Sequence, residues 1–321
     1  MTDTEPVMIA FGPVPSRRLG RSLGINNIPP KSCSYSCVYC QVGPTRRQEI
    51  EPREFFKPGV IVQAVTQHVQ AARNAGAHID YLTFVPDGEP TLDINLGQTI
   101  DQLRPLGIKI AVISNASLVW RDDVRHALNK ADWVSLKVDS VNESVWRQIN
   151  QPHPELTLPT ILQGIQDFAK SYKGVLTTET MLAAGINDQP ELLAGVADFL
   201  ATINPHTAYL AAPIRPPAQS DVRIPDETVF VSAYEILRTK VKNVEYLIGY
   251  EGDTFAATGD PVRDLLAITA VHPMREAAVR EFLTQAGLSW DLVSELLQQD
   301  ELKEIQYAGQ RFYIRKVSAE K

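Results

Sequence analysis

The chain has 321 residues, of which 44% are hydrophobic and 21% charged, with a formal net charge of −7. This composition excludes collagen-like, coiled-coil and wholly disordered proteins, and the negative charge argues against a protein that coats nucleic acid over its whole surface. The sequence has no run of about 18 apolar residues and no basic-then-apolar leader, so we expect a cytoplasmic protein without a membrane partner.

Residues 1–250 are predicted to form one domain of alternating strands and helices. Apolar runs of strand length alternate with helical patterns, which is typical of βα units around a parallel sheet. A late helix at about 226–240 and a strand at Val244–Ile248 are expected to complete an α/β fold, a partial (β/α)6 TIM-like barrel. The six main strands are Ser22–Asn26, Tyr81–Val85, Ile108–Ser114, Trp133–Val138, Val175–Met181 and Ala208–Ala212, and the helices between them span about 59–75, 95–105, 121–130, 157–172 and 189–203.

The C-terminal part of the chain is predicted to be a second domain. The glycine-containing segment 249–259 has no helical period, so residues 251–259 are expected to be a linker. Residues 260–321 then follow a winged-helix-like order, with helices at about 260–270, 274–286 and 289–299 before the strands Leu302–Tyr307 and Arg311–Lys316. The presumed recognition helix, 289–300, has three acidic and no basic residues. We therefore expect this domain to contact a protein partner or gate substrate, rather than read duplex nucleic acid.

All three cysteines of the chain, Cys33, Cys37 and Cys40, fall within eight consecutive positions. Such a cluster is not a disulfide framework and indicates a metal site in a reducing compartment. In the spacing C-x-x-x-C-x-x-C, three thiolates can bind three irons of a [4Fe–4S] cubane and leave the fourth iron open to a small ligand. A zinc site and a non-catalytic electron-transfer cluster are the alternatives. The nearest histidine in sequence is His68, and the loop lacks paired C-x-x-C knuckles.

The thiol spacing, its place after the first expected strand and the βα repeats resemble the radical S-adenosylmethionine enzymes over roughly residues 11–248. This resemblance implies that the amino and carboxylate groups of S-adenosylmethionine chelate the open iron. One electron then cleaves the sulfonium to give a 5′-deoxyadenosyl radical, which abstracts hydrogen from a substrate. A one-electron donor such as flavodoxin or ferredoxin is an implied partner.

The same resemblance implies cofactor-binding residues at the ends of the expected strands. The segment Asp87-Gly88-Glu89-Pro90 resembles the family's Gly-Gly-Glu segment, which receives the methionine amino group. The other implied contacts are Ser114 and Asn115 after the third strand, Lys137 and Asp139 at the end of the fourth, and Tyr39 inside the thiol loop. The structural alternatives are a simple turn at Asp87-Gly88, a surface ion pair between Lys137 and Asp139, and packing alone for Tyr39. His272, beside a proline, is expected to be a solvated loop residue.

The string FGPVPSRRLGRSLGIN, which begins at Phe11, looks most like the wyosine-type tRNA-modifying branch of these enzymes. Prokaryote-type wyosine synthases use a second iron–sulfur cluster, and this chain has no thiol left to hold one. Residues 11–57 contain eight basic and three acidic residues. The excess positive charge could attract an RNA backbone or pair with the acidic remainder of the barrel.

The expected substrate is therefore a tRNA-like RNA. No catalytic residue is assigned. The alternative enzyme is a peptide or protein radical installer that resembles the glycyl-radical activating enzymes. The alternative in which the protein is not an enzyme is an iron–sulfur sensor or binding module.

Overall fold

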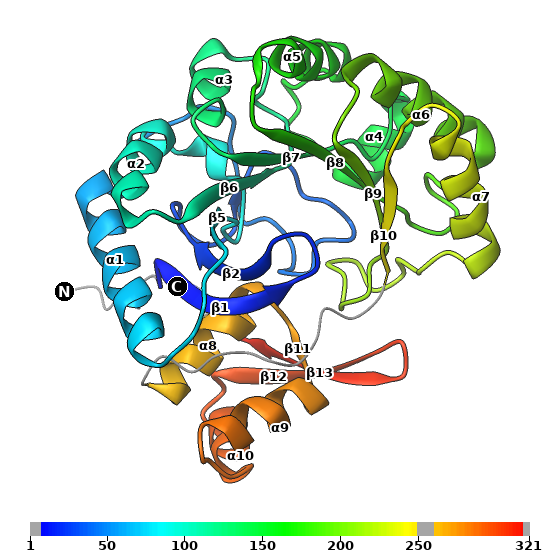
Figure 1. Cartoon of the computed structure of the whole chain (residues 1–321). Coiled ribbons are helices and arrows are strands. Elements are labelled where there is room, and N and C mark those ends of the chain that lie inside the picture. Colours follow the sequence, from blue (N-terminus) through cyan, green and yellow to red (C-terminus); the bar gives the residue numbers. More distant parts are fainter. Residues whose placement is uncertain (1–7, 249–259, 317–321) are drawn as a thin grey trace.

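The computed structural model describes residues 8–248 and 260–316 (Figure 1). The predicted linker, 251–259, lies outside the described residues. Within the described ranges, none of the helices is long and apolar enough to cross a membrane.

One curled eight-stranded sheet forms the centre of the molecule, in the order β1-β2-β5-β6-β7-β8-β9-β10 (Figure 1). From β2 onward all neighbours are parallel, whereas β1 is antiparallel to β2. The predicted α/β partial barrel is thus confirmed, and the carboxyl ends of seven parallel strands meet at one edge. The strands are β1 Ala10–Ser16, β2 Gly20–Ile25, β5 Tyr81–Phe84, β6 Lys109–Ser114, β7 Trp133–Lys137, β8 Val175–Met181, β9 Thr207–Ala211 and β10 Val244–Leu247.

Strand β1 was not predicted from the sequence. Its segment AFGPVPS contains two prolines and a glycine, which normally argue against a strand. The strand lies at the edge of the sheet, where a proline without an N–H costs no ladder hydrogen bond, and its register with β2 shifts between Phe11 and Val14. An edge position and a bulge therefore accommodate the prolines.

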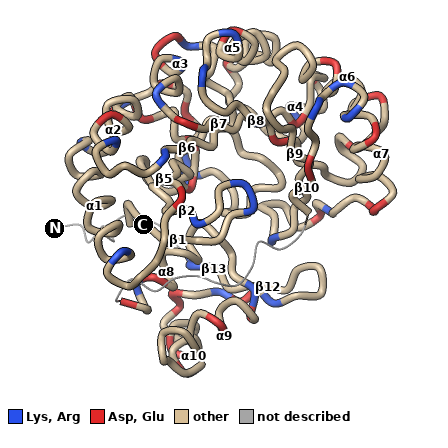
Figure 2. Tube along the Cα trace, in the orientation of Figure 1, with Lys and Arg blue, Asp and Glu red and all other residues tan. Residues whose placement is uncertain are grey.

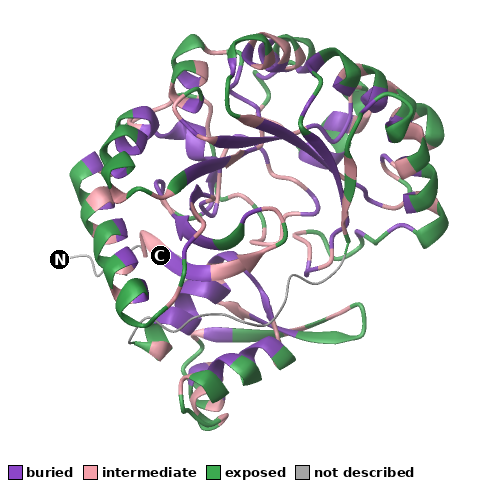
Figure 3. Cartoon of the chain, in the orientation of Figure 1, coloured by how far each residue is buried: buried purple, intermediate pink, exposed green. Residues whose placement is uncertain are grey.

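Helices cover the outer face of the sheet, and their exposed sides face away from it (Figures 1 and 3). In α1, the buried residues Ile61, Val65, Val69 and Ala72 recur at spacings of three and four, so one face packs on the sheet. The helices are α1 Pro58–Asn74, α2 Leu96–Leu103, α3 Asp122–Leu128, α4 Glu143–Asn150, α5 Leu158–Ser171, α6 Pro190–Ile203 and α7 Glu227–Arg238, with 3-10 turns η1 Pro90–Leu92 and η2 Arg104–Leu106.

Helix α4 was also missed from the sequence. It has only eight residues, of which Val145, Trp146 and Ile149 are apolar, so its helical pattern extends over only about two turns. Its start is fixed instead by Asn142, whose side-chain oxygen accepts from the backbone N–H groups of Ser144 and Val145 at 3.1 and 3.2 Å.

The turn between β1 and β2 closes the amino end of the barrel. Leu19 in this turn is buried in a cluster with Ala111, Trp133 and Tyr209, which come from three different parallel strands. Figure 2 shows the arginines of this turn, which projects toward the middle of the barrel. The open, carboxyl end of the barrel is therefore the place for a ligand.

The C-terminal residues form a smaller unit with its own core, which packs below β1 (Figure 1). Its three-stranded antiparallel sheet has the order β11-β13-β12. Phe11 of β1 packs against Ala267 and Val271 of α8, which joins this unit to the barrel. Its elements are α8 Pro261–Val271, β11 Met274–Arg275, α9 Glu276–Gln285, α10 Asp291–Gln298, β12 Leu302–Tyr307 and β13 Gln310–Arg315.

Candidate active site

The three cysteines lie in the loop after β2, at the carboxyl edge of the sheet. Cys33 belongs to the short strand β3, Ser32–Cys33, which pairs with β4, Arg47–Gln48. Two successive turns follow, because Cys40 N donates to Cys37 O at 3.0 Å and Gly43 N donates to Cys40 O at 3.1 Å. Backbone hydrogen bonds thus fix the positions of all three thiols.

Helix α4 holds this loop from the other side. The Tyr35 and Trp146 rings meet edge to face with centroids 5.9 Å apart, and Trp146 Nε1 donates to Tyr35 Oη at 3.2 Å. Val38 N donates to the carbonyl of Ile149 at 3.0 Å. Tyr35 therefore packs against α4 and anchors the thiol loop to this helix.

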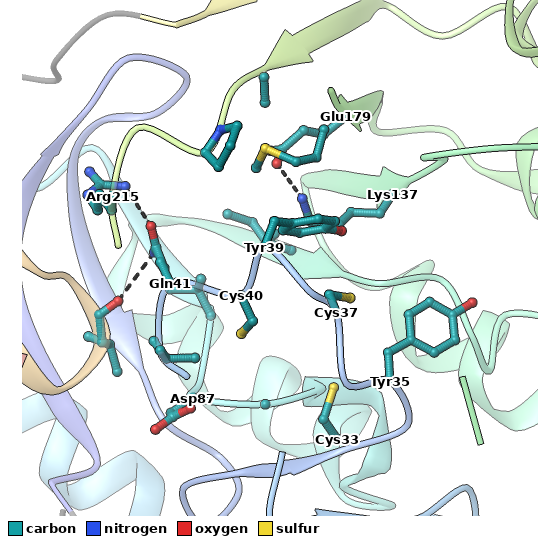
Figure 4. Close-up of a pocket in the computed structure, with 18 of the residues that line it drawn as sticks. Cys33, Tyr35, Cys37, Tyr39, Cys40, Gln41, Asp87, Lys137, Glu179 and Arg215 are labelled. Carbon is teal, nitrogen blue, oxygen red and sulfur yellow. Dashed lines mark hydrogen bonds and ion pairs between the residues drawn. The ribbon is translucent and has the colours of Figure 1, made fainter. Parts of the chain in front are cut away.

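All three thiols line one cavity of about 260 Å³ (Figure 4). Among the predicted cofactor-binding residues, Tyr39, Asp87, Gly88 and Lys137 also line it. The other predicted residues are not among those that line the cavity and lie behind its lining; they are Glu89, Pro90, Ser114, Asn115 and Asp139. No three His, Cys, Asp or Glu side chains in residues 8–248 and 260–316 converge on a position for a single metal ion.

Two amide side chains donate hydrogen bonds to the sulfur atoms. Asn115 Nδ2 lies 3.4 Å from Cys33 Sγ, and Asn150 Nδ2 lies 3.4 Å from Cys37 Sγ. Burial raises the pKa of the Cys33 thiol well above its usual value and raises the pKa of Cys37 to about 12, with Asp139 adding to the latter shift. Burial also raises the pKa of Cys40. A metal that binds these thiols must therefore displace protons, and the amide donors then face thiolates.

The Asp87-Gly88 segment is a close backbone approach as well as a turn. A Cβ at Gly88 would lie 1.9 Å from the carbonyl oxygen of Ser32, beside Cys33, so only glycine fits. Lys31 ties the same two segments together: its N–H donates to Asp87 O at 2.7 Å and its Nζ lies 3.0 Å from Asp87 Oδ2. Burial raises the pKa of Asp87, although Lys31 partly offsets this.

Glu89 is buried and organises the wall behind the thiols. Its Oε1 accepts from Thr91 N, Thr91 Oγ1 and Ser114 Oγ at 3.0, 2.6 and 2.8 Å. Its Oε2 accepts from Asn115 N at 2.7 Å, which leaves that oxygen room for one more donor. Pro90 begins η1, and its carbonyl accepts from Asn27 Nδ2 at 2.9 Å.

Lys137 and Asp139 do not form a surface ion pair. Lys137 Nζ lies 2.5 Å from Glu179 Oε1 and 5.1 Å from the centre of the Tyr39 ring (Figure 4). Asp139 is buried and accepts hydrogen bonds from Tyr39 Oη, from Asn150 Nδ2 at 2.7 Å and from Met181 N at 2.8 Å. Tyr39 therefore stands between the lysine and the aspartate and touches both.

Sequence reasoning missed several polar residues at this cavity or beside it. Arg18, Glu179 and Arg215 line it, and Arg215 Nη2 lies 3.0 Å from Nε2 of His272. The expectation that His272 is solvated is wrong, since its side chain is buried against Arg215. Glu179 could have been found from the sequence, because it is a charged residue inside an expected buried strand. Nothing in the sequence distinguishes Arg18 from the neighbouring arginines.

The Radical SAM superfamily matches residues 27–194, which include the thiol loop and strands β5 to β8. The chain therefore belongs to the radical SAM superfamily, whose enzymes use a [4Fe–4S] cluster and S-adenosylmethionine and need an electron donor, and the resemblance seen in the sequence is confirmed.

The chain is also similar to individual proteins and solved structures. UPF0026 protein MJ1312 of Methanocaldococcus jannaschii is 46% identical over 313 residues, which are 97% of each chain. Ribosomal RNA large subunit methyltransferase N of Nitrosopumilus maritimus is 22% identical over 240 residues, 73% of this chain and 66% of that protein. The solved structure of TYW1 with a lysine–pyruvate adduct bound has a TM-score of 0.53 at 17% identity, and it covers 69% of this chain and 74% of its own. This last likeness supports the partial barrel.

Proposed function

We propose that this enzyme binds one [4Fe–4S] cluster through Cys33, Cys37 and Cys40 and modifies an RNA, tRNA-like substrate by radical chemistry. The observation that carries the proposal is that all three thiols line one cavity at the carboxyl edge of a parallel sheet. When bound, the cluster supplies the electron that splits S-adenosylmethionine into methionine and a 5′-deoxyadenosyl radical, which takes a hydrogen atom from the substrate.

The residues of the chain orient and insulate this chemistry. Asn115 and Asn150 donate N–H groups toward two of the sulfur atoms, and Glu89 holds the Asn115 backbone in place. Glu89 Oε2 has an acceptor site left beside its bond from Asn115 N, and we propose that it receives the methionine amino group at the part of the cavity that Gly88 lines. Tyr39, Lys137 and Asp139 lie on the opposite side of the thiols, where we propose the ribose contacts.

Three features favour RNA as the substrate class. The relative from Nitrosopumilus maritimus is named for ribosomal RNA, and the string from Phe11 resembles the tRNA-modifying branch. Of the eight basic residues in 11–57, Arg18 pairs with Glu179, Lys31 with Asp87, and Arg47 and Arg53 with Glu49. Arg21 and Lys57 have exposed side chains that can meet phosphates.

For the C-terminal unit, residues 260–316, we propose a winged-helix-like role in binding a protein partner. Helices α9 and α10 are separated by a short turn and followed by the β12–β13 hairpin, which is the order of a winged helix. Its place against β1 and the acidic α10 are compatible with a protein surface rather than with a DNA groove. The electron donor, a flavodoxin or ferredoxin, is one partner of this kind.

The test has three parts. Anaerobic reconstitution should give about four irons per chain, and addition of reductant with S-adenosylmethionine should release 5′-deoxyadenosine. Replacement of any one of the three cysteines by alanine should abolish that release, with Ser36→Ala in the same loop as the control. Stoichiometric zinc, or no 5′-deoxyadenosine, would contradict the proposal.

The substrate class is tested by filter binding of bulk tRNA across a salt series. A complex that depends on phosphate contacts must weaken steeply with salt. Iron loading and cleavage without any salt-sensitive tRNA binding would favour a peptide or protein substrate instead, and cluster loading without cleavage would favour a sensor.

A further inference from the structure

Arg18 enters the cavity from the amino end of the barrel, away from the thiol loop. Its neighbour Leu19 is packed among Ala111, Trp133 and Tyr209 at the closed end, so the β1–β2 turn forms a plug. Arg18 itself lines the cavity. The side chain is therefore part of the cavity floor, and it reaches Glu179, 161 residues away in sequence.

Three charged side chains meet at this floor. Glu179 Oε1 lies 2.5 Å from Lys137 Nζ, and Glu179 Oε2 is paired with Arg18 Nη1. Side-chain exposure is 9% for Glu179, 14% for Arg18 and 19% for Lys137. Burial raises the pKa of Glu179, but Lys137 and Arg18 outweigh it and hold that pKa at about 2. The carboxylate is thus ionised, and the three side chains together carry one net positive charge.

The floor has unused capacity to bind an anion. Arg18 Nε is buried without a hydrogen-bond partner, and only one nitrogen of its guanidinium faces Glu179. A guanidinium presents its donors as a planar fork that matches a carboxylate or a phosphate. A net positive charge at a poorly hydrated site attracts one negative charge more strongly than the same charge at the surface does.

Most of the implied cofactor contacts lie on another side of the site, and Lys137 is the one that the floor shares with them. Gly88 and Glu89 follow β5 and Asn115 follows β6, close to Cys33, whereas Arg18 comes from the plug at the other end of the barrel. Met181, Ala211 and Leu247, the last residues of β8, β9 and β10, line the same cavity nearer its carboxyl edge and are apolar. The floor therefore suits a compact organic group with one negative charge.

Resting on the proposed function, we propose that Arg18 and Lys137 bind an oxyanion, a carboxylate or a phosphate, of the substrate. Glu179 is then the internal counter-ion that positions both cations and limits how tightly the anion is held. Lys137 is shared between this floor and the Tyr39 face, so it places the anionic group next to the reacting centre.

The experiment measures binding of inorganic phosphate and of acetate to the full chain by calorimetry, at fixed ionic strength set with sodium chloride. The two probes separate a phosphate site from a carboxylate site. At least one of them should bind, Arg18→Gln should weaken that binding by about tenfold or more, and Glu179→Gln should tighten it. Arg73→Gln, which removes an exposed arginine from the last turn of α1, should bind as the unchanged chain does.

Opposite effects of the two floor variants separate anion binding from a merely structural ion pair, because loss of a structural pair would harm both variants alike. If thermal unfolding shows that Arg18→Gln does not fold, the anion affinity of Glu179→Gln still tests the proposal: tighter binding supports it, and unchanged or weaker binding contradicts it. Wild-type binding of neither probe, or equal affinity in Arg18→Gln, would overturn the proposal. The proposal would also be overturned if Arg18→Gln lost S-adenosylmethionine affinity as strongly as it lost anion affinity, since Arg18 would then be a cofactor contact. Release of 5′-deoxyadenosine by Arg18→Gln without substrate tests the proposed function separately and should persist.

Discussion

The side-chain amide of Asn150 lies 2.7 Å from a carboxylate oxygen of Asp139. The same nitrogen is 3.4 Å from Cys37 Sγ, so one residue of α4 links the thiol loop to the end of β7. A short helix that was not predicted from the sequence thus sets the electrostatic surroundings of a predicted cluster ligand.

Replacement of Asn150 by alanine should make the reduction potential of the bound cluster more negative. An N–H donor directed at a ligand sulfur stabilises the reduced, more negative cluster, and the variant removes that donor. Unfolding should also become easier by about 1–3 kcal/mol, because buried Asp139 loses a partner. A redox titration followed by electron paramagnetic resonance measures the first effect.

Asn142→Ala is the matched control, since it removes the cap of the same helix at an exposed site and costs about 1 kcal/mol. It should leave the potential unchanged. Equal potentials in Asn150→Ala and the wild type would show that the amide serves Asp139 alone.

Gly88→Ala should destabilise the folded chain by more than about 3 kcal/mol or prevent iron loading. The added methyl group would overlap the Ser32 carbonyl, and that backbone cannot move without displacing Cys33. Gly59→Ala is the control, because nothing lies within 4 Å of a Cβ there and alanine favours a helix. Denaturant unfolding and iron content measure both variants, and a Gly88→Ala chain that folds and loads normally would refute the close approach.

Local signals made much of this site predictable. The three cysteines and the Asp87–Pro90 segment are short motifs, and β6 contains the continuous apolar run Ile110–Ile113. The misses have physical causes. Prolines hid β1 because only its edge position tolerates them, and the contact of Arg18 with Glu179 exists only because the sheet curls until a plug from its first hairpin reaches β8. No local pattern encodes that closure.

Glu89→Ala should weaken S-adenosylmethionine binding and leave the cluster in place. The variant removes the proposed acceptor for the methionine amino group and also leaves the donors of Thr91, Ser114 and Asn115 without a partner. Iron content and S-adenosylmethionine affinity are measured together, with Glu89→Gln as the variant that keeps the shape and most acceptor capacity. Loss of iron in Glu89→Ala would identify a structural carboxylate, and unchanged affinity would remove Glu89 from the cofactor site.

The Glu179 carboxylate should make the chain acid-sensitive in a defined range. Its pKa is about 2 in the folded chain, below the ordinary 4.5, so its stabilising contribution is complete above pH 4.5 and is lost as the pH falls toward 2. The shift corresponds to about 3 kcal/mol at most. The difference in unfolding free energy between the wild type and Glu179→Gln should therefore shrink steadily over that range. A constant difference would mean that the carboxylate titrates normally.

His272 should report on the contact between the barrel and the C-terminal unit. Burial, with a smaller effect of Arg215, holds its pKa well below 6.5, so the folded chain keeps the imidazole neutral and lets Nε2 accept from Arg215 at 3.0 Å. An unfolded chain protonates this histidine below pH 6.5, and the folded state therefore loses stability as the pH falls from 6.5.

Between pH 7.5 and 5.5 the wild type should lose about 1.4 kcal/mol more unfolding free energy than His272→Gln, which keeps an acceptor but does not titrate. His206→Gln, at an exposed site on the barrel, controls for ordinary histidine titration. If the wild type and His272→Gln respond to pH alike, His272 is solvated in solution, and the C-terminal unit does not close that side of the cavity.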